Sequence, residues 1–433
     1  MVPLRFRPET TRALLLFLLA LLVYNANLRV IASGDSRATR FVPLALLRSG
    51  TFALDDFRLH VKGFFQNAYW AEEMDGHLVS MYPVVTPLLA APLYIPAAIY
   101  LERRGWQDRP LAFAAALSEK LAASVLAAAS VGLLYLLLRR RAPRGDALLL
   151  TLAYAFGTNT WATSSQALWQ HGASQLLLIA ALLAATGERT AGRFAVCGVC
   201  CGLLAANRPL DALLAGAVAA WLALEVPDKR RLAAFVLPAA AVGLAFALYN
   251  VAVFGQPLGG YPLLIRDGFF DHSVLSGLAG LFFSPGKGLF VFSPVLLFLF
   301  ARPFVAGPPE DRRLDLCLAA GSAALLFVLA RADWRGGFCY GPRFLTDLLP
   351  VFFWLLVPVL ARMGRGLRIA FVAALLLSLP QQVIGVLYYP FGKSDMVLAG
   401  KVENNWKVEN AQFLLEWRNS PPLFRRPPQE PRK

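Results

Sequence analysis

The stretch LAAFVLPAAAVGLAFALYNVAVF, residues 232–254, contains no charged side chain and directly follows the basic sequence Asp228-Lys229-Arg230-Arg231. A helix needs about 20 predominantly apolar residues to cross a bilayer. Clusters of Lys and Arg mark the cytoplasmic ends of such helices. The segment therefore predicts a helix that enters the membrane from the cytoplasmic side.

Similar apolar stretches recur along most of the chain. Of its 433 residues 57% are hydrophobic and only 16% are charged, a balance that excludes an ordinary soluble globular domain. We expect an all-α polytopic membrane protein with about 11 transmembrane helices of the required length. The expected spans begin near Arg12, Leu111, Ala147, Gly172, Phe194, Asp211, Leu232, Gly288, Leu314, Phe344 and Ile369.

The short basic loops fall on one side if these spans alternate, and that side is the cytoplasm. They are residues 139–144, 188–193, 228–231, 302–313 and 362–368. This places the protein in the cell inner or plasma membrane, with its N-terminus in the cytoplasm. Residues 1–390 form a single transmembrane domain with a large first outer loop, 33–82, and residues 391–433 form an outer tail. The tail is proline-rich and charged from Pro421 onward, so part of it is expected to be disordered.

Residues 83–101 are apolar enough to cross, but a crossing there would reverse the side of every later loop. Their prolines, at positions 83, 87, 92 and 96, cost helix hydrogen bonds. We therefore favour a broken, re-entrant or interfacial element packed inside protein. The alternative is a true second span that is paired with another span.

The net charge of +15 does not indicate nucleic-acid binding, because the basic residues occur in brief clusters between apolar runs. Three of the five cysteines, Cys197, Cys200 and Cys201, lie in one apolar segment without a nearby histidine or acid. Small core residues are their expected role. We assign no metal and no other cofactor.

Asp35, in Ser33-Gly34-Asp35-Ser36-Arg37, immediately follows the first span. A carboxylate at the membrane edge is costly unless it is used or paired, so Asp35 is the leading candidate base. Alternatively, Asp35 caps the next helix and is neutralised by Arg37 or Arg40. Asp56 follows in the same loop beside another aspartate, and such pairs can divide acid and base roles or simply be solvated.

Residues 331–343 form the densest polar and aromatic cluster between two expected spans. Trp334 and Tyr340 have rings that stack on a sugar or anchor at the lipid headgroups. Arg343 has a fork of donors that suits phosphate oxygens, although it can also snorkel to headgroups.

Three more cations or potential cations are candidates for binding an anion. Arg208 is either a second anion ligand or the structural partner of Asp211. His171 assists a phosphate, relays a proton or caps a helix. Lys287 lies in Ser284-Pro285-Gly286-Lys287-Gly288, where glycines expose backbone N–H groups, and we expect it to contact a lipid-linked phosphate or headgroup.

These features together resemble the GT-C superfamily of membrane glycosyltransferases, including its protein O-mannosyltransferase and aminoarabinose-transferase branches. The architecture is similar over most of the chain. The matching motifs are Gly34-Asp35 with Arg37 and Arg40, Tyr82-Pro83-Val84-Val85-Thr86-Pro87-Leu88, Arg208-Pro209, residues 284–288 and residues 336–343. The chain departs from the O-mannosyltransferases in having Asp35-Ser36 where they have an Asp-Glu pair.

The resemblance implies a sugar donor on a polyprenyl phosphate, an acceptor that reaches the site from outside, and an aspartate base, which Asp35 matches. Asp56 is a second catalytic candidate beside Asp35. Arg343, Arg208, His171 and Lys287 are expected at the donor phosphate. Tyr340, Trp334 and Arg37 are expected at the sugar or the acceptor, a glycan, lipid or protein. The alternatives are a transporter or flippase of lipid-linked sugars and a structural membrane subunit.

Overall fold

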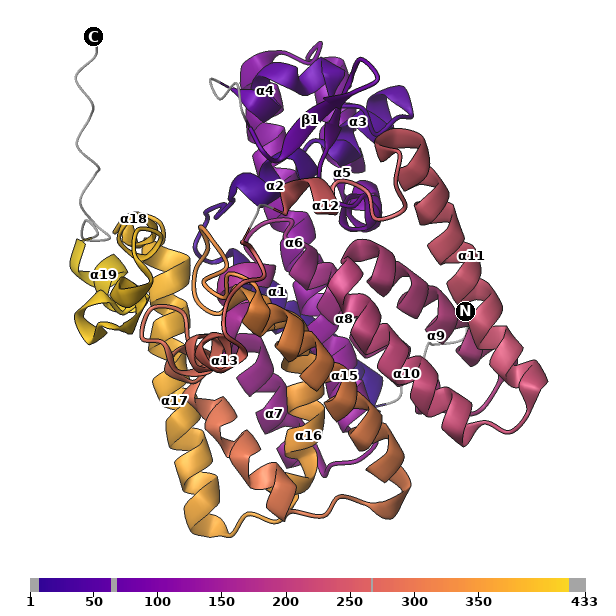
Figure 1. The fold of residues 1–433 in the computed structure, drawn as a ribbon, viewed down its shortest axis with the longest axis vertical. Coiled ribbons are helices and arrows are strands. Elements are labelled where there is room, and N and C mark those ends of the chain that lie inside the picture. Colours follow the sequence, from indigo (N-terminus) through magenta and orange to yellow (C-terminus); the bar gives the residue numbers. More distant parts are fainter. Residues whose placement is uncertain (1–7, 64–67, 266–267, 420–433) are drawn as a thin grey trace.

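The computed structural model describes residues 8–63, 68–265 and 268–419. They form an elongated, mostly helical bundle (Figure 1). In the described residues six helices are long and apolar enough to cross a membrane: Val85–Arg103, Asp108–Leu138, Arg230–Phe254, Pro309–Arg331, Arg343–Ala361 and Arg365–Tyr388. The expected multi-pass helical architecture is confirmed at this level, and the count of about 11 spans stays a prediction.

The α-helices are, in chain order, α1 (Pro8–Asn25), α2 (Gly34–Thr39), α3 (Val42–Ser49), α4 (Arg58–Lys62), α5 (Val85–Arg103), α6 (Asp108–Leu138), α7 (Arg144–Phe156), α8 (Gln170–Ala185), α9 (Ala191–Asn207), α10 (Ala212–Glu225), α11 (Lys229–Phe254), α12 (Tyr261–Leu264), α13 (Val274–Phe283), α14 (Leu289–Phe292), α15 (Arg312–Arg331), α16 (Leu349–Ala361), α17 (Arg365–Tyr388), α18 (Ser394–Leu398) and α19 (Gln412–Asn419). The 3-10 helices are η1 (Asp55–Phe57), η3 (Pro209–Asp211), η4 (Pro294–Phe304), η5 (Pro309–Asp311), η6 (Arg343–Leu348), η7 (Val402–Trp406) and η8 (Val408–Asn410), and a single π-helical turn is η2 (Thr160–Ser164).

Helix α6, with 31 residues, runs along the bundle as its longest element. Helix α1 packs on its C-terminal half, where Gly132 faces the backbone carbonyl of Ala13. A β-carbon at Gly132 would lie 3.0 Å from that oxygen, so glycine permits the close approach. Asn25, at the end of α1, contacts Ser124 near the middle of α6. The other half of α6 therefore extends beyond the end of α1.

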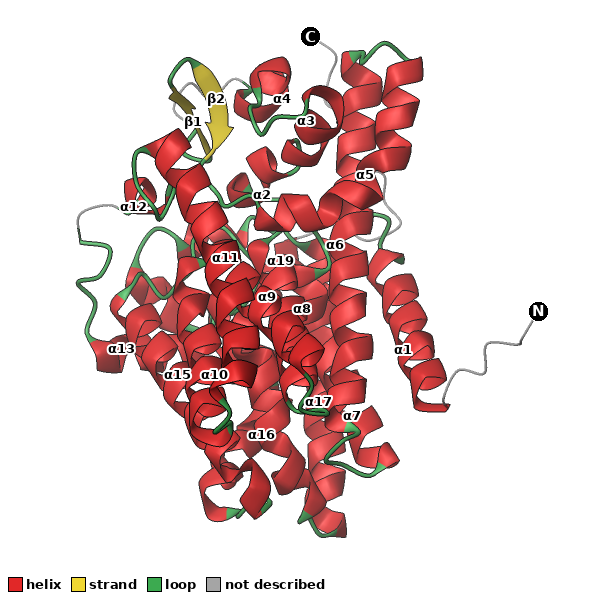
Figure 2. Cartoon of the chain, turned by 90° about the vertical axis from the view of Figure 1, so that its right-hand side faces the viewer, coloured by secondary structure: helices red, strands yellow, loops and turns green. Residues whose placement is uncertain are grey.

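Helix α5 packs on this second half of α6 and is unbroken, with Pro92 and Pro96 inside it. The expectation of a broken segment was wrong, because packing against α6 holds the helix despite its lost hydrogen bonds. At the turn between α5 and α6, the guanidinium of Arg48 lies 4.7 Å from the centre of the Trp106 ring, and His60 contacts Asp108 at 3.2 Å. The α5–α6 hairpin therefore points toward the first loop (Figure 2).

The first loop, residues 33–82, contains the only strands in the described part of the chain. β1 (Ala71–Met74) and β2 (His77–Ser80) pair antiparallel, with Ala71 opposite Ser80. Asp75 and Gly76 form the turn with positive φ values of 49° and 84°, as two-residue hairpin turns require. The all-α prediction missed this hairpin. We call the end of the bundle that carries this loop the loop face.

After α17 the chain forms the short elements α18, η7, η8 and α19, which lie beside the end of α17 (Figure 1). The side-chain amide of Gln412 accepts a hydrogen bond from the N–H of Gly341 at 2.8 Å and donates to the carbonyl of Cys339 at 2.9 Å. The described part of the tail thus holds the loop that precedes η6. The predicted disorder after Pro421 lies outside the described residues.

Candidate functional site

A cavity of about 880 Å³ opens at the loop face. It lies between α2, the starts of α8 and η6, the ends of α9 and α15, and the segment that includes α12. Helices α2 and α12 stand at the same height in both views (Figures 1 and 2). Its polar lining includes Asp35, Tyr69, Tyr82, His171, Arg208 and Arg343, and its apolar lining includes Leu258, Leu263, Ile265, Phe269, Phe270 and Phe344.

Asp35 lies in the first turn of α2, and Ser33 caps that helix. The Ser33 hydroxyl accepts a hydrogen bond from the Asp35 N–H at 3.1 Å, while the Ser36 hydroxyl accepts one from the Ser33 N–H at 3.3 Å. This is a capping box. The Asp35 carboxylate is therefore not needed as a cap and is free to contact other groups.

The partner of Asp35 is Arg343, at the start of η6, although 308 positions separate the two residues. Arg343 also donates to the carbonyl of Gly336 at 2.7 Å, and its guanidinium lies 4.7 Å from the centre of the Trp169 ring. The Tyr69 hydroxyl donates to the other Asp35 oxygen at 2.8 Å. The two arginines expected as neutralising partners lie elsewhere: Arg40 pairs with Glu119 and Arg37 lies over the Trp70 ring.

Burial raises the pKa of Asp35, but Arg343 and the hydroxyls of Tyr82 and Tyr69 together lower it below its ordinary value. The carboxylate is therefore ionised at neutral pH and, while these contacts last, is a weak base. Burial and the neighbouring Asp35 raise the pKa of Tyr69, so its hydroxyl stays a donor. Gly34 makes this contact possible, because a β-carbon there would lie 2.3 Å from the Tyr69 oxygen.

A second charged group lies behind the cavity wall and centres on Asp347, which the sequence prediction missed. One carboxylate oxygen of Asp347 lies 2.9 Å from Nδ1 of His171, and the other accepts a hydrogen bond from Arg208. Arg208 also lies 3.9 Å from Asp211, the partner expected from the sequence. A single carboxylate in an apolar span is a recognisable signal for function, and Asp347 carries it, four positions after Arg343.

The two arginines approach the same aromatic ring. The guanidinium carbon of Arg343 lies 5.3 Å from the centre of the Phe344 ring and that of Arg208 lies 5.8 Å from it. Such contacts orient a cation while leaving donors available. Asp35, Arg208 and Arg343 therefore meet in one cavity, together with His171, and their roles there remain predictions.

The structure places the other predicted site residues outside the lining of this cavity. Asp56 lies 3.4 Å from Arg48 on the exposed part of the first loop. Lys287 is buried and contacts the carbonyl of Cys339 and, at 3.5 Å, Asp395.

The predicted sugar-stacking residues are packed inside the protein. Tyr340 is buried, and its hydroxyl donates to the Gln381 carbonyl at 2.5 Å. Trp334 is also buried and lies against Trp406, with 6.0 Å between their rings. Arg37 faces the Trp70 ring at 5.1 Å. Two cavity-lining tyrosines to which the sequence prediction gave no role in the site, Tyr69 and Tyr82, contact the candidate base instead.

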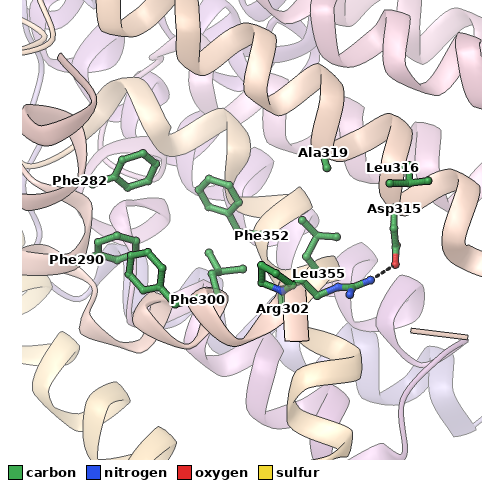
Figure 3. Close-up of a pocket in the computed structure, with 11 residues that line it drawn as sticks. Phe282, Phe290, Phe300, Arg302, Asp315, Leu316, Ala319, Phe352 and Leu355 are labelled. Atoms are coloured by element: carbon green, nitrogen blue, oxygen red, sulfur yellow. Dashed lines mark hydrogen bonds and ion pairs between the residues drawn. The ribbon is translucent and has the colours of Figure 1, made fainter. Parts of the chain in front are cut away.

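A second cavity, of about 460 Å³, lies between α13, η4, α15 and α16 (Figure 3). Its lining is mostly aromatic and aliphatic, with the ion pair of Arg302 and Asp315 at one end (Figure 3). Asp315 lies in the first turn of α15, whereas the cavity at the loop face touches the end of that helix at Leu329. The two cavities are therefore separate, and the lining of the second has no tyrosine or histidine and one arginine instead of two.

No protein-family model and no curated protein matches this sequence. Among solved structures, the fold is similar to the crystal structure of ArnT from Cupriavidus metallidurans bound to undecaprenyl phosphate, with a TM-score of 0.53 and 12% sequence identity. The match covers 94% of this chain and 75% of that chain. The two proteins therefore share a fold, in agreement with the GT-C-like architecture expected from the sequence.

Proposed function

We propose that this protein is a glycosyltransferase that moves a sugar from a polyprenyl-phosphate donor to an acceptor at the loop face, which we take as the outer face of the membrane. One observation carries the proposal. A carboxylate and two guanidiniums from distant parts of the chain line a cavity whose lining is otherwise largely apolar. That combination suits a sugar phosphate joined to a lipid tail.

The chemistry of transfer needs both kinds of charged group. As the acceptor attacks the anomeric carbon, the bond from that carbon to the phosphate oxygen breaks, and its electron pair leaves with the phosphate. Cations stabilise the growing negative charge on the phosphate, a role for Arg343 and Arg208. A base must take the proton of the acceptor hydroxyl or amine, the role proposed for Asp35. A single displacement of this kind inverts the anomeric centre.

The contact between Asp35 and Arg343 suggests an order of events. A phosphodiester that enters the cavity competes with the carboxylate for the same guanidinium. When Arg343 turns to the phosphate, Asp35 loses the cation that lowers its pKa and becomes a stronger base. The acceptor is then activated only after the donor has bound. We assign no metal or other cofactor to this reaction.

The apolar residues of the cavity lining are proposed to hold the first isoprene units of the donor. Leu258, Leu263 and Ile265 belong to the segment around α12 and are about half exposed. These apolar side chains thus line the cavity and remain accessible to a lipid. The structure of ArnT with undecaprenyl phosphate supports the class of lipid.

The proposal is tested with purified full-length protein in liposomes that contain a polyprenyl phosphate carrying a radiolabelled sugar. A glycosyltransferase forms a covalent labelled product with an added acceptor extract and releases polyprenyl phosphate. A flippase moves the label across the bilayer with the donor intact. We expect covalent product from wild type, a strong loss in Arg343→Gln, and wild-type rates in Asp56→Asn. Movement of intact donor without product would reject the proposal in favour of transport.

A further inference from the structure

His171 differs from the other polar groups of the cavity in having one side free. It lies in the first turn of α8, and its side chain is 6% exposed. Its Nδ1 contacts Asp347, whose other oxygen accepts from Arg208. Because Arg208 donates to the same carboxylate, we assign the hydrogen shared with Asp347 to Nδ1. Among the described residues no hydrogen-bond partner contacts Nε2, and the ring lines the cavity.

The charges that line the cavity leave no surplus of positive charge for an anion. Arg343 is paired with Asp35, and Arg208 is paired with Asp347. Asp333 and Glu72 add negative charge to the lining, and Arg335 is already bound to Asp333 at 2.8 Å. A phosphate that enters would therefore bring a largely buried and uncompensated charge, which is costly.

His171 is the cavity group that can supply a positive charge without breaking an ion pair. Asp347 on η6 favours protonation of the ring. Burial, the nearby Arg343 and Arg208, and the positive end of the α8 dipole oppose it. The other titratable groups near this cluster are Asp211 on η3, Tyr261 on α12 and Asp35 on α2. Burial is the strongest of these influences, so the ring is neutral before a ligand binds, and an additional anion in the cavity favours the imidazolium.

We propose that the binding of a phosphate lipid in this cavity is linked to the uptake of one proton by His171. The imidazolium then donates an Nε2–H hydrogen bond to a phosphate oxygen, while Asp347 holds the Nδ1–H. This inference rests on the proposed function for the identity of the ligand and adds a proton to the binding step. His171 would strengthen its contact as the sugar leaves and the charge on the phosphate grows.

The test measures affinity for the methyl ester of undecaprenyl phosphate, a phosphodiester with a single charge across the pH range used. Full-length protein in nanodiscs is titrated with this lipid between about pH 6 and pH 8.5, which brackets the ordinary pKa of imidazole. In wild type the affinity should fall with rising pH, approaching about tenfold per pH unit, the limit for one linked proton. In His171→Asn, which keeps a donor for Asp347, the affinity should be nearly independent of pH.

His77→Asn is the matched control. His77 forms the same kind of pair, with Nδ1 2.8 Å from Asp55, but on the exposed first loop. This variant should keep the wild-type slope. A flat wild-type profile, or an unchanged slope in His171→Asn, would overturn the inference, and a slope lost only in Asp35→Asn would assign the proton to that carboxylate instead.

A direct count of protons keeps the inference testable if His171→Asn fails to fold. Calorimetry of wild type in buffers with different ionisation enthalpies should give about one proton taken up per lipid bound near pH 7.5. A value of zero would overturn the inference while leaving the proposed function intact. Failure of the lipid to bind at any pH would instead contradict the proposed function.

Discussion

Replacing Arg343 with methionine should destabilise the protein through the charge that it leaves behind. The side chains of Asp35 and Arg343 are 19% and 11% exposed. Removing one partner of a buried ion pair costs about 3–5 kcal/mol, because the other charge stays buried without compensation. Asp35 keeps partial exposure and its tyrosine hydroxyls, so we expect a loss of about 2–3 kcal/mol in the free energy of unfolding at pH 7.

The pH dependence of this loss has a definite sign. In wild type the pKa of Asp35 is lowered, so its contribution to stability is present above the ordinary carboxyl pKa and is lost as pH falls through the lowered value. In Arg343→Met burial becomes the main influence and raises the pKa of Asp35. Protonation then removes the buried charge, and the deficit of the variant should shrink as pH falls from 7 toward the carboxyl range.

The assay is denaturant unfolding in detergent micelles, followed by tryptophan fluorescence at pH 7 and at about pH 4.5, near the ordinary carboxyl pKa. Asp35→Asn and the double variant complete a double-mutant cycle. The double variant should be more stable at pH 7 than Arg343→Met alone, since it lacks the unpaired carboxylate. A deficit that is independent of both pH and residue 35 would refute this reasoning and indicate that Arg343 acts only by packing.

Three smaller predictions follow from single contacts. Tyr69→Phe removes a hydrogen-bond donor to Asp35 and so raises the pKa of Asp35. The acid limb of the pH profile of kcat/KM for transfer should therefore move to higher pH. An acid limb that does not move would argue against Asp35 as the base. Asp56→Asn, outside the cavity lining, should change transfer by less than about twofold and stability by less than about 0.5 kcal/mol. Gln412→Ala breaks two buried hydrogen bonds to the loop before η6. We expect a loss of about 1–3 kcal/mol in the free energy of unfolding and weaker lipid binding in a titration. Unchanged lipid affinity would show that the tail does not position Arg343.

Most of the helical architecture could be predicted from the sequence, because a long apolar run has few alternatives to a membrane-embedded helix. The segment 232–254 illustrates this, since it forms most of α11. Helix α5 illustrates the limit. Its prolines predict a break, yet packing along α6 keeps it continuous. Asp75-Gly76 is a local sequence signal for a hairpin turn. The prediction missed it because the apolar pattern of the whole chain favoured helices everywhere.

Part of the candidate site could be predicted, because a residue at the end of a membrane helix must lie at one face of the bundle. Asp35, Arg208, His171 and Arg343 each stand at the end of a helical segment on the loop face, so they could meet. Lys287, Trp334 and Tyr340 stand in similar loops but turn inward. Their direction depends on tertiary contacts such as that between Lys287 and the Cys339 carbonyl, which no local pattern encodes. Asp347 carries the local signal of a carboxylate in an apolar span, but its partners, His171 and Arg208, are distant in sequence, so no local pattern places it at the site.

The rate of sugar transfer by wild type and Asp35→Asn, compared as purified proteins at matched concentration in liposomes, tests the central claim most directly. Asparagine keeps the shape of the side chain and can still accept a hydrogen bond from Tyr69, but it cannot take a proton. The account predicts covalent product from wild type and a rate about 10²–10⁴-fold lower in the variant. A correctly folded Asp35→Asn protein that transfers sugar at the wild-type rate would contradict the catalytic role assigned to this carboxylate.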